Sequence, residues 1–217
     1  DFLHITLGQF KNEFVNTPIF WDSDMQPTGA MEQIKWENEK LKLSLNLGQF
    51  FYTSNKVPAD HLYASILGYQ LGAEFKSSPL FSFELSSSFY DFSRPSLSID
   101  FSDASTPKMK GNTLNNNQLA TAFQLIGLIM KLHFYTSTPM TFTAEYLGNT
   151  APSKNNNGTY TQLKIGKDFP EPVTLFYEFG YSEANAMVSA FMDNTFTYKG
   201  NTSNIQGHRL GFDFKLM

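Results

Sequence analysis

The chain has 217 residues and no cysteine, which excludes disulfides, thiolate metal sites and a catalytic thiol. Hydrophobic residues make up 41%, yet no run approaches the roughly 20 apolar residues that a membrane-spanning helix needs. A net charge of -4 argues against nucleic acid as a partner, because a phosphate backbone calls for a basic surface. Nothing resembles a linker, so we expect a single domain over residues 1–217.

Two short patterns at residues 2–10 and 31–38 open the chain, and they predict weak strands. The next pattern, KLKLSLNLGQF at residues 40–50, is much clearer, because four leucines from Leu41 to Leu47 alternate with polar residues. Period-two alternation predicts a strand with one apolar and one polar face. In a soluble sandwich these leucines would enter a core, whereas in a membrane barrel they would meet lipid.

The same alternation recurs along the rest of the chain. It predicts further strands at residues 69–76, 80–90, 126–135, 140–148, 161–167, 173–181 and 209–216. The total is about ten strands. Aromatic residues make up 16%, with 22 Phe and 10 Tyr, which suits the aromatic girdles of a membrane barrel.

The predicted connections alternate in length. Short links, such as KSSP and TSTP, fall between longer ones at residues 11–28, 54–60, 94–116, 149–158 and 186–203. Outer-membrane barrels have short periplasmic turns and longer external loops, whereas the crossovers of a sandwich do not require this alternation. We therefore predict an all-β fold, a transmembrane antiparallel up-and-down β-barrel of about ten strands whose leucines face lipid.

The N-terminal region carries a resemblance. The segments LGQFKNEF, PIFWDSDMQPTGA and IKW combine a Gly-x-Phe-Lys strand end with a loop that bears Asp-Ser-Asp. Over about the first 35 residues, the chain resembles the putative porin family of outer-membrane β-barrels from predatory and related Gram-negative bacteria. The resemblance implies a passive pore without catalytic residues. It also leads us to expect longer relatives, and a terminal aromatic residue where this sequence ends in Met217.

The polar faces of the predicted strands supply a candidate pore lining in which both charge signs interleave. Ten strands fall near the closed end of the range of barrel widths, so we expect internal ion pairs and either a narrow pore or a filled barrel. The predicted pore-lining residues are Lys40, Lys42, Asn46, Glu74, Lys76, Glu84, Lys131, Glu145, Lys164, Glu178, Arg209 and Asp213. Lys35, Glu37 and Lys215 share these polar faces.

The sequence offers little evidence for a metal site or a catalytic site. Four histidines without an HExxH pattern give no zinc ligand set, and we expect no metal, no cofactor and no enzyme activity. One group of residues suggests protease activity as an alternative. Asp22 and Asp24 in the first loop would share one rim of the barrel with Asp60 and His61. Omptin proteases place such residues at their rim, where a carboxylate orients an imidazole that activates water. Otherwise these carboxylates order a loop or bind cations among lipopolysaccharide heads.

We therefore predict a narrow channel for passive diffusion of small solutes or ions in the bacterial outer membrane. A non-conducting structural or surface-interaction barrel is the second hypothesis, and a rim protease is the third. The expected partners are outer-membrane lipid, lipopolysaccharide and the barrel-assembly machinery, with no nucleic acid.

Overall fold

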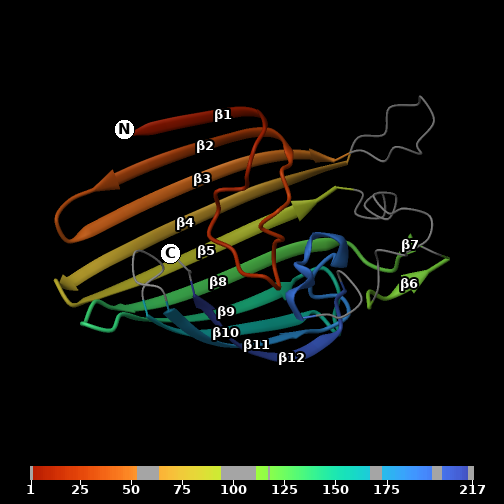
Figure 1. Ribbon diagram of the computed structural model, residues 1–217. Helices are drawn as coiled ribbons and strands as arrows, with labels where there is room; N and C mark the ends of the chain where they lie inside the picture. The colour runs from red at the N-terminus through yellow and green to blue at the C-terminus, as the bar shows by residue number, and fades with distance from the viewer. Residues whose placement is uncertain are drawn as a thin grey trace.

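Ten antiparallel strands form one sheet in the computed structural model (Figure 1), which describes residues 2–52, 64–93, 111–116, 118–166, 173–196 and 202–214. The strands are β1 (Leu3–Gln9), β2 (Thr28–Glu37), β3 (Leu41–Tyr52), β4 (Ala64–Ser78), β5 (Phe81–Phe92), β8 (Phe123–Phe134), β9 (Met140–Asn149), β10 (Asn157–Gly166), β11 (Val173–Ser182) and β12 (Ile205–Phe214). Their order in the sheet follows the chain. This confirms the predicted all-β, up-and-down fold of ten strands.

Smaller elements lie at the end of the sheet where the long loops gather. Strands β6 (Leu114–Asn115) and β7 (Gln118–Leu119) form a separate two-stranded hairpin that the sequence did not predict. Two 3-10 turns, η2 (Ser189–Phe191) and η3 (Asn194–Phe196), follow β11. Among the described residues, no helix is both long and apolar enough to cross a membrane.

The sheet curves into an open barrel around the chain segments between β1 and β2 and after β11 (Figure 1). Its two edges are β1 and β12, which do not pair with each other within the described residues. The short turns after β2, β4 and β8 join strand ends on one side of the molecule, and the strand ends that the longer connections join lie on the other. We call these the turn end and the loop end.

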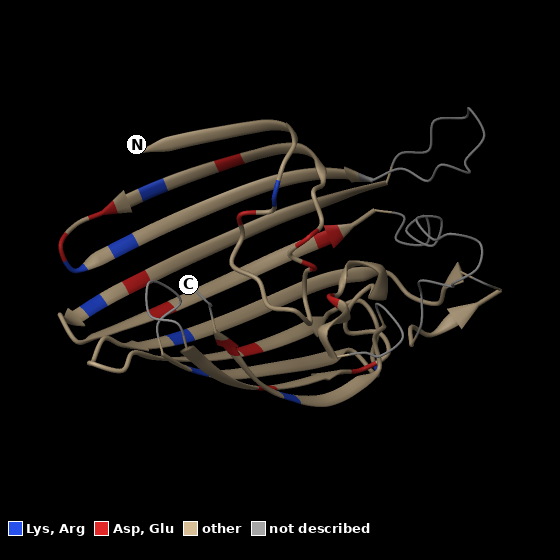
Figure 2. Cartoon of the chain, viewed as in Figure 1, with Lys and Arg blue, Asp and Glu red and all other residues tan. Residues whose placement is uncertain are grey.

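The inner face of the sheet changes character along the strands. Toward the loop end it carries an apolar core that includes Phe50, Ile66, Tyr90, Phe123 and Leu147, all buried. Toward the turn end of β2 to β8 it carries charged residues of both signs (Figure 2). The inner face is therefore apolar at one end and polar at the other.

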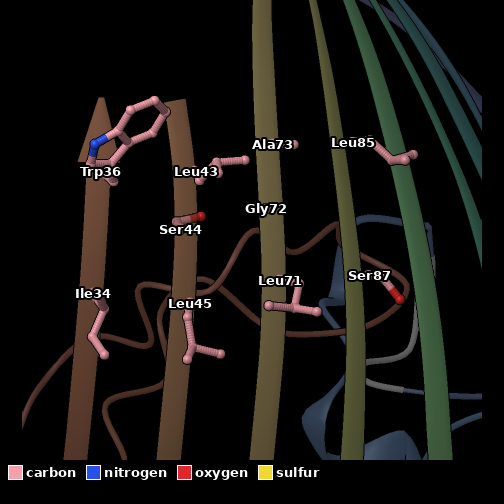
Figure 3. A pocket seen from close by; sticks show the side chains of 10 residues that line it. All are labelled: Ile34, Trp36, Leu43, Ser44, Leu45, Leu71, Gly72, Ala73, Leu85 and Ser87. Atoms are coloured by element: carbon pink, nitrogen blue, oxygen red, sulfur yellow. The ribbon is translucent and has the colours of Figure 1, made fainter. Parts of the chain in front are cut away.

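The outer face carries the leucines of the clearest sequence pattern. Leu43 is 42% exposed and Asn46 is 4% exposed, so the two sets of residues on β3 point to opposite faces. Figure 3 shows Leu43, Leu45 and Leu71 on the outer side, around a shallow apolar hollow of about 420 Å³. An exposed apolar face of this extent favours lipid over water as its surroundings.

The core is completed from inside the barrel by the first long connection. Phe14, Ile19, Phe20 and Trp21 are buried against the inner face, together with residues 186–192 from the segment after β11. The prediction that residues 11–28 form an external loop is therefore wrong for most of that segment. Its apolar side chains fold inward because the loop end of the inner face is itself apolar.

Candidate functional site: a partitioned lumen

The register of the sheet aligns one residue from each strand, from β2 to β12, into a continuous row across the inner face. In strand order this row consists of Glu37, Lys42, Glu74, Glu84, Lys131, Thr143, Gln162, Glu178 and Arg209. We call it the charged belt. Directly opposed residues on antiparallel strands have their side chains within reach of each other. The belt therefore places unlike charges next to one another at most of its charged positions, whereas Glu74 and Glu84 are a like-charged pair.

Several members of the charged belt form ion pairs. Lys131 Nζ lies 3.3 Å from Glu84 Oε1, and His133 Nε2 lies 3.6 Å from Glu84 Oε2. At the exposed end of the belt, Lys76 Nζ lies 3.4 Å from Glu37 Oε1. These pairs agree with the expectation that interleaved charges in a narrow lumen neutralise one another.

The most enclosed pair joins β11 and β12. Glu178 is 1% exposed, and its Oε2 lies 2.5 Å from Arg209 Nε. Its Oε1 accepts hydrogen bonds from the Tyr160 hydroxyl at 2.9 Å and from Gln162 Nε2 at 2.6 Å. The carboxylate is thus saturated with donors, which is what a buried charge requires.

Residues 13–17 of the first connection cross the inside of the barrel and are fixed to its wall. The backbone N–H of Val15 donates to Gln70 Oε1 at 2.8 Å, and Gln70 Nε2 donates back to the Val15 carbonyl at 2.8 Å. The Tyr90 hydroxyl donates to Asn16 Oδ1, and the Thr17 hydroxyl donates to Glu145. Strands β4, β5 and β9 therefore all hold this segment, which we call the partition.

Glycines in the wall make room for the partition. Gly48 and Gly68 are register partners on β3 and β4. A Cβ atom at Gly68 would lie 3.0 Å from the ring of Phe14, and one at Gly48 would lie 2.6 Å from the ring of Phe50 and 3.3 Å from that of Phe14. The glycine of the second LGQF segment therefore serves close packing of an inward aromatic ring, in agreement with its interpretation as barrel geometry.

The partition separates two cavities. The central cavity, on the turn side, has a volume of about 230 Å³ and is lined by Glu13, Val15, Gln33, Lys35, Lys42, Ser44, Asn46, Gly72, Ala73, Glu74, Glu84 and Ser86. The outer cavity has about 220 Å³ and is lined by Lys11, Asn12, Phe14, Asn16, Thr17, Pro18, Trp21, Ser23 and Asp193. Residues of the partition line both cavities, so it is the wall between them.

The segment after β11 supports the partition from the loop end. The backbone N–H of Asp22 donates to the Phe191 carbonyl at 2.7 Å, and that of Asp193 donates to the Pro18 carbonyl at 2.9 Å. The Trp21 and Phe191 rings pack with centroids 5.5 Å apart. The two inward segments therefore behave as one packed unit.

A family model described as "Putative porin" matches residues 1–133. The chain belongs to the putative porin family. The match confirms the resemblance seen in the N-terminal region and indicates a porin-like protein. The chain has no match among the curated proteins or among the solved structures.

The matched residues of this porin cover the partition and both strands that hold Val15 and Asn16. They also include the charged belt from Glu37 to Lys131 and every residue that lines the central cavity. The family assignment and the site geometry therefore concern the same part of the chain.

Most of the predicted pore-lining residues of this porin lie on the inner face. Within the described strands, these are Lys42, Asn46, Glu74, Lys76, Glu84, Lys131, Glu145, Lys164, Glu178, Arg209 and Asp213. Lys40 lies in the exposed turn before β3. The structure brings Lys42, Asn46, Glu74 and Glu84 together around the central cavity. That these residues line an open pore stays a prediction.

The rim constellation is only partly described. Asp22 Oδ1 accepts a hydrogen bond from the backbone N–H of Asp24 at 2.9 Å, which is a loop-ordering contact. Burial raises the pKa of Asp22, and the nearby Asp193 and Asp24 carboxylates act in the same direction. Asp60 and His61 lie outside the described residues. Among the described residues, no group of three or more acidic or histidine side chains is placed to hold a metal ion.

The sequence did not predict the residues that fix the partition. Gln70 and Val15 are 55 positions apart, and no spacing rule connects them. One signal was present: PIFW at residues 18–21 is an apolar run inside a connection predicted to be external. Such a run favours burial, and in a barrel the available apolar surface is the inside of the loop end.

Proposed function

We propose that this member of the putative porin family forms a narrow channel in the bacterial outer membrane for passive diffusion of small polar solutes or ions, constricted by the partition. The observation that carries the proposal is the pair of cavities on either side of residues 13–17, behind an outer face of exposed leucines. A sheet that is apolar outside and polar inside suits lipid on one side and water on the other.

In this proposal the outer face contacts lipid and lipopolysaccharide acyl chains, and the barrel-assembly machinery inserts the protein. The path for a solute leads from the outer cavity past the partition into the central cavity. The partition is one segment of irregular backbone that side-chain hydrogen bonds hold to the wall. Each of these bonds contributes about 1 kcal/mol net to stability. In this proposal, a displacement of this segment that breaks these bonds joins the two cavities.

A second function is supported by the same segment. The bonds that fix the partition are partly or fully buried, and the apolar packing of Phe14, Phe20 and Trp21 closes the loop end. A barrel with this interior would serve as a non-conducting structural or surface-interaction protein if the partition does not move.

The test is the conductance of the purified full-length chain in a planar lipid bilayer, for the wild type and for Gln70→Leu. Gln70→Leu removes both hydrogen bonds to Val15, so we expect small steps from the wild type and larger or more frequent steps from the variant. Ser88→Ala, at the register position next to Gln70 on β5, is the matched control and should behave as the wild type. Absence of steps from both the wild type and Gln70→Leu would favour the non-conducting barrel.

A further inference from the structure

The central cavity contains charges that the barrel does not neutralise. Lys42 and Glu74 are direct register partners, yet neither makes an ion pair or hydrogen bond with another described side chain. Lys35 Nζ donates to Gln33 Oε1 at 3.1 Å and faces no carboxylate within ion-pair distance among the described residues. Glu84, at the same cavity, is paired with Lys131, and elsewhere on the inner face Glu178 and Arg209 pair with each other.

These charges are segregated by strand. The unpaired cations Lys35 and Lys42 come from β2 and β3, whereas the unpaired carboxylate Glu74 comes from β4. Glu84 of β5, which pairs with Lys131, and Glu13 of the partition also line the cavity. All of them line the same cavity. A small molecule in the cavity therefore meets a positive wall on one side and a negative wall on the other.

An orphaned acceptor lies at the same cavity. Gln70 uses its Oε1 for the Val15 N–H and its Nε2 for the Val15 carbonyl, so the orientation of its amide is fixed. Asn46 must then direct its Nδ2 toward Gln70 Oε1, at 3.3 Å. Its Oδ1 is left buried without a partner in the described part of the chain. An unpaired buried acceptor is costly, and a ligand that donates a hydrogen bond would relieve that cost.

We propose that the central cavity is a binding site for small zwitterionic solutes, with the solute carboxylate held by Lys35 and Lys42 and its ammonium group held by Glu74 and Asn46. The cavity of about 230 Å³ is smaller than the sites of about 300 to 1,000 Å³ that hold drug-sized ligands, which limits the solute to amino-acid or short-peptide size. The inference rests on the proposed channel function only for the route by which the solute arrives.

The other simple occupants fit less well. A metal cation would need converging carboxylates, and the described residues offer no such group, while Lys35 and Lys42 would repel it. A plain anion would leave Glu74 and the Asn46 acceptor without a partner. A zwitterion satisfies both walls at once.

The experiment measures binding to the full-length chain in lipid nanodiscs by isothermal titration calorimetry, with three probes. Glycylglycine carries both charges, N-acetylglycylglycine carries only the carboxylate, and glycylglycinamide carries only the ammonium group. We expect glycylglycine to bind at least about tenfold more tightly than either analogue, because each analogue loses one charge-assisted contact. Three similar affinities, or no binding of any probe, would overturn the proposal without any variant being made.

Variants then assign the two walls. Lys42→Gln should weaken glycylglycine about tenfold and leave glycylglycinamide unchanged, whereas Glu74→Gln should weaken glycylglycine and leave N-acetylglycylglycine unchanged. Lys154→Gln and Glu39→Gln, on exposed surface away from the cavity, are matched controls that should change nothing. Equal effects of both cavity variants on all three probes would contradict the assignment.

Conductance separates this inference from the proposed function. Selective binding of glycylglycine to a chain that never conducts would refute the channel and keep the binding site. Conductance without any preference among the three probes would keep the channel and refute the binding site.

Discussion

The sidedness of the sheet makes a quantitative prediction at Leu45. This residue lies four positions into β3, and with a rise of about 3.3 Å per residue it is about 13 Å along the strand. A strand tilt of about 40° places it about 10 Å above the turn end of a band about 25 Å tall, which is near its middle. Leu45→Arg should therefore lower the free energy of unfolding by about 2 to 4 kcal/mol.

Ser44 provides the matched comparison, because it is the residue directly before Leu45 on β3 and lines the central cavity on the inner face. Ser44→Arg introduces the same charge into a polar environment, so its cost should be far smaller. Leu45→Ala gives the part of the loss that comes from the missing side chain rather than from the charge. The excess of Leu45→Arg over Leu45→Ala is the cost of placing the charge in lipid.

The assay is a urea titration of protein refolded into lipid vesicles, followed by tryptophan fluorescence. The two tryptophans report from different places: Trp21 is 4% exposed in the packed unit inside the barrel, and Trp36 is 47% exposed on the outer face. Equal destabilisation by Leu45→Arg and Ser44→Arg would refute the assignment of the leucines to the lipid face.

Three further predictions concern the charges. Lys42→Glu should shift the reversal potential in a salt gradient toward cations, and the shift should grow as ionic strength falls, because screening weakens. Arg209→Met should lower the free energy of unfolding by about 3 kcal/mol, because it leaves the enclosed Glu178 carboxylate without its cation, and adding Glu178→Met should restore most of that loss. Burial raises the folded-state pKa of Asp22, so the native chain holds that proton more tightly than the unfolded chain and gains stability as pH falls through the raised pKa. Asp22→Asn should therefore be more stable than the wild type at neutral pH, and a difference that does not shrink in urea titrations at lower pH would contradict this.

The strands were predictable where the two faces of the sheet differ. Residues 40–50 and 80–90 were predicted from alternation, and they correspond to Leu41–Tyr52 and Phe81–Phe92. The prediction at residues 69–76 missed the start of β4 at Ala64. There the inner face is part of the apolar core, with Ile66 buried, while the outer face carries Leu67, so apolar residues occur on both faces and the alternation is lost. The missed start of β4 thus lies in the part of the wall that packs against the first connection and the segment after β11.

For the central cavity, the sequence predicted which residues share the inner face but not which of them lie together. Alternation assigned Lys42, Asn46 and Glu74 to one face because the period of a strand is local. Which of these residues surround a common cavity depends on register and on the position of the partition. The Gln70 contact with Val15 joins residues far apart in sequence, and the orphaned Asn46 acceptor is a consequence of that contact. A single sequence gives no signal for either.

The features that carry the proposed function do not depend on how the edges of the sheet are paired. Lipid cannot hydrogen-bond to the free backbone groups of β1 and β12, so in a membrane both edges need strand partners, whether each other or further strands. The diameter of the barrel follows from that pairing. Among the described residues, however, the central cavity is lined by β2 to β5 and the partition alone, and the partition is held by β4, β5 and β9. The constriction and the segregated charges are therefore properties of the middle of the sheet, and they persist whichever strands close the barrel.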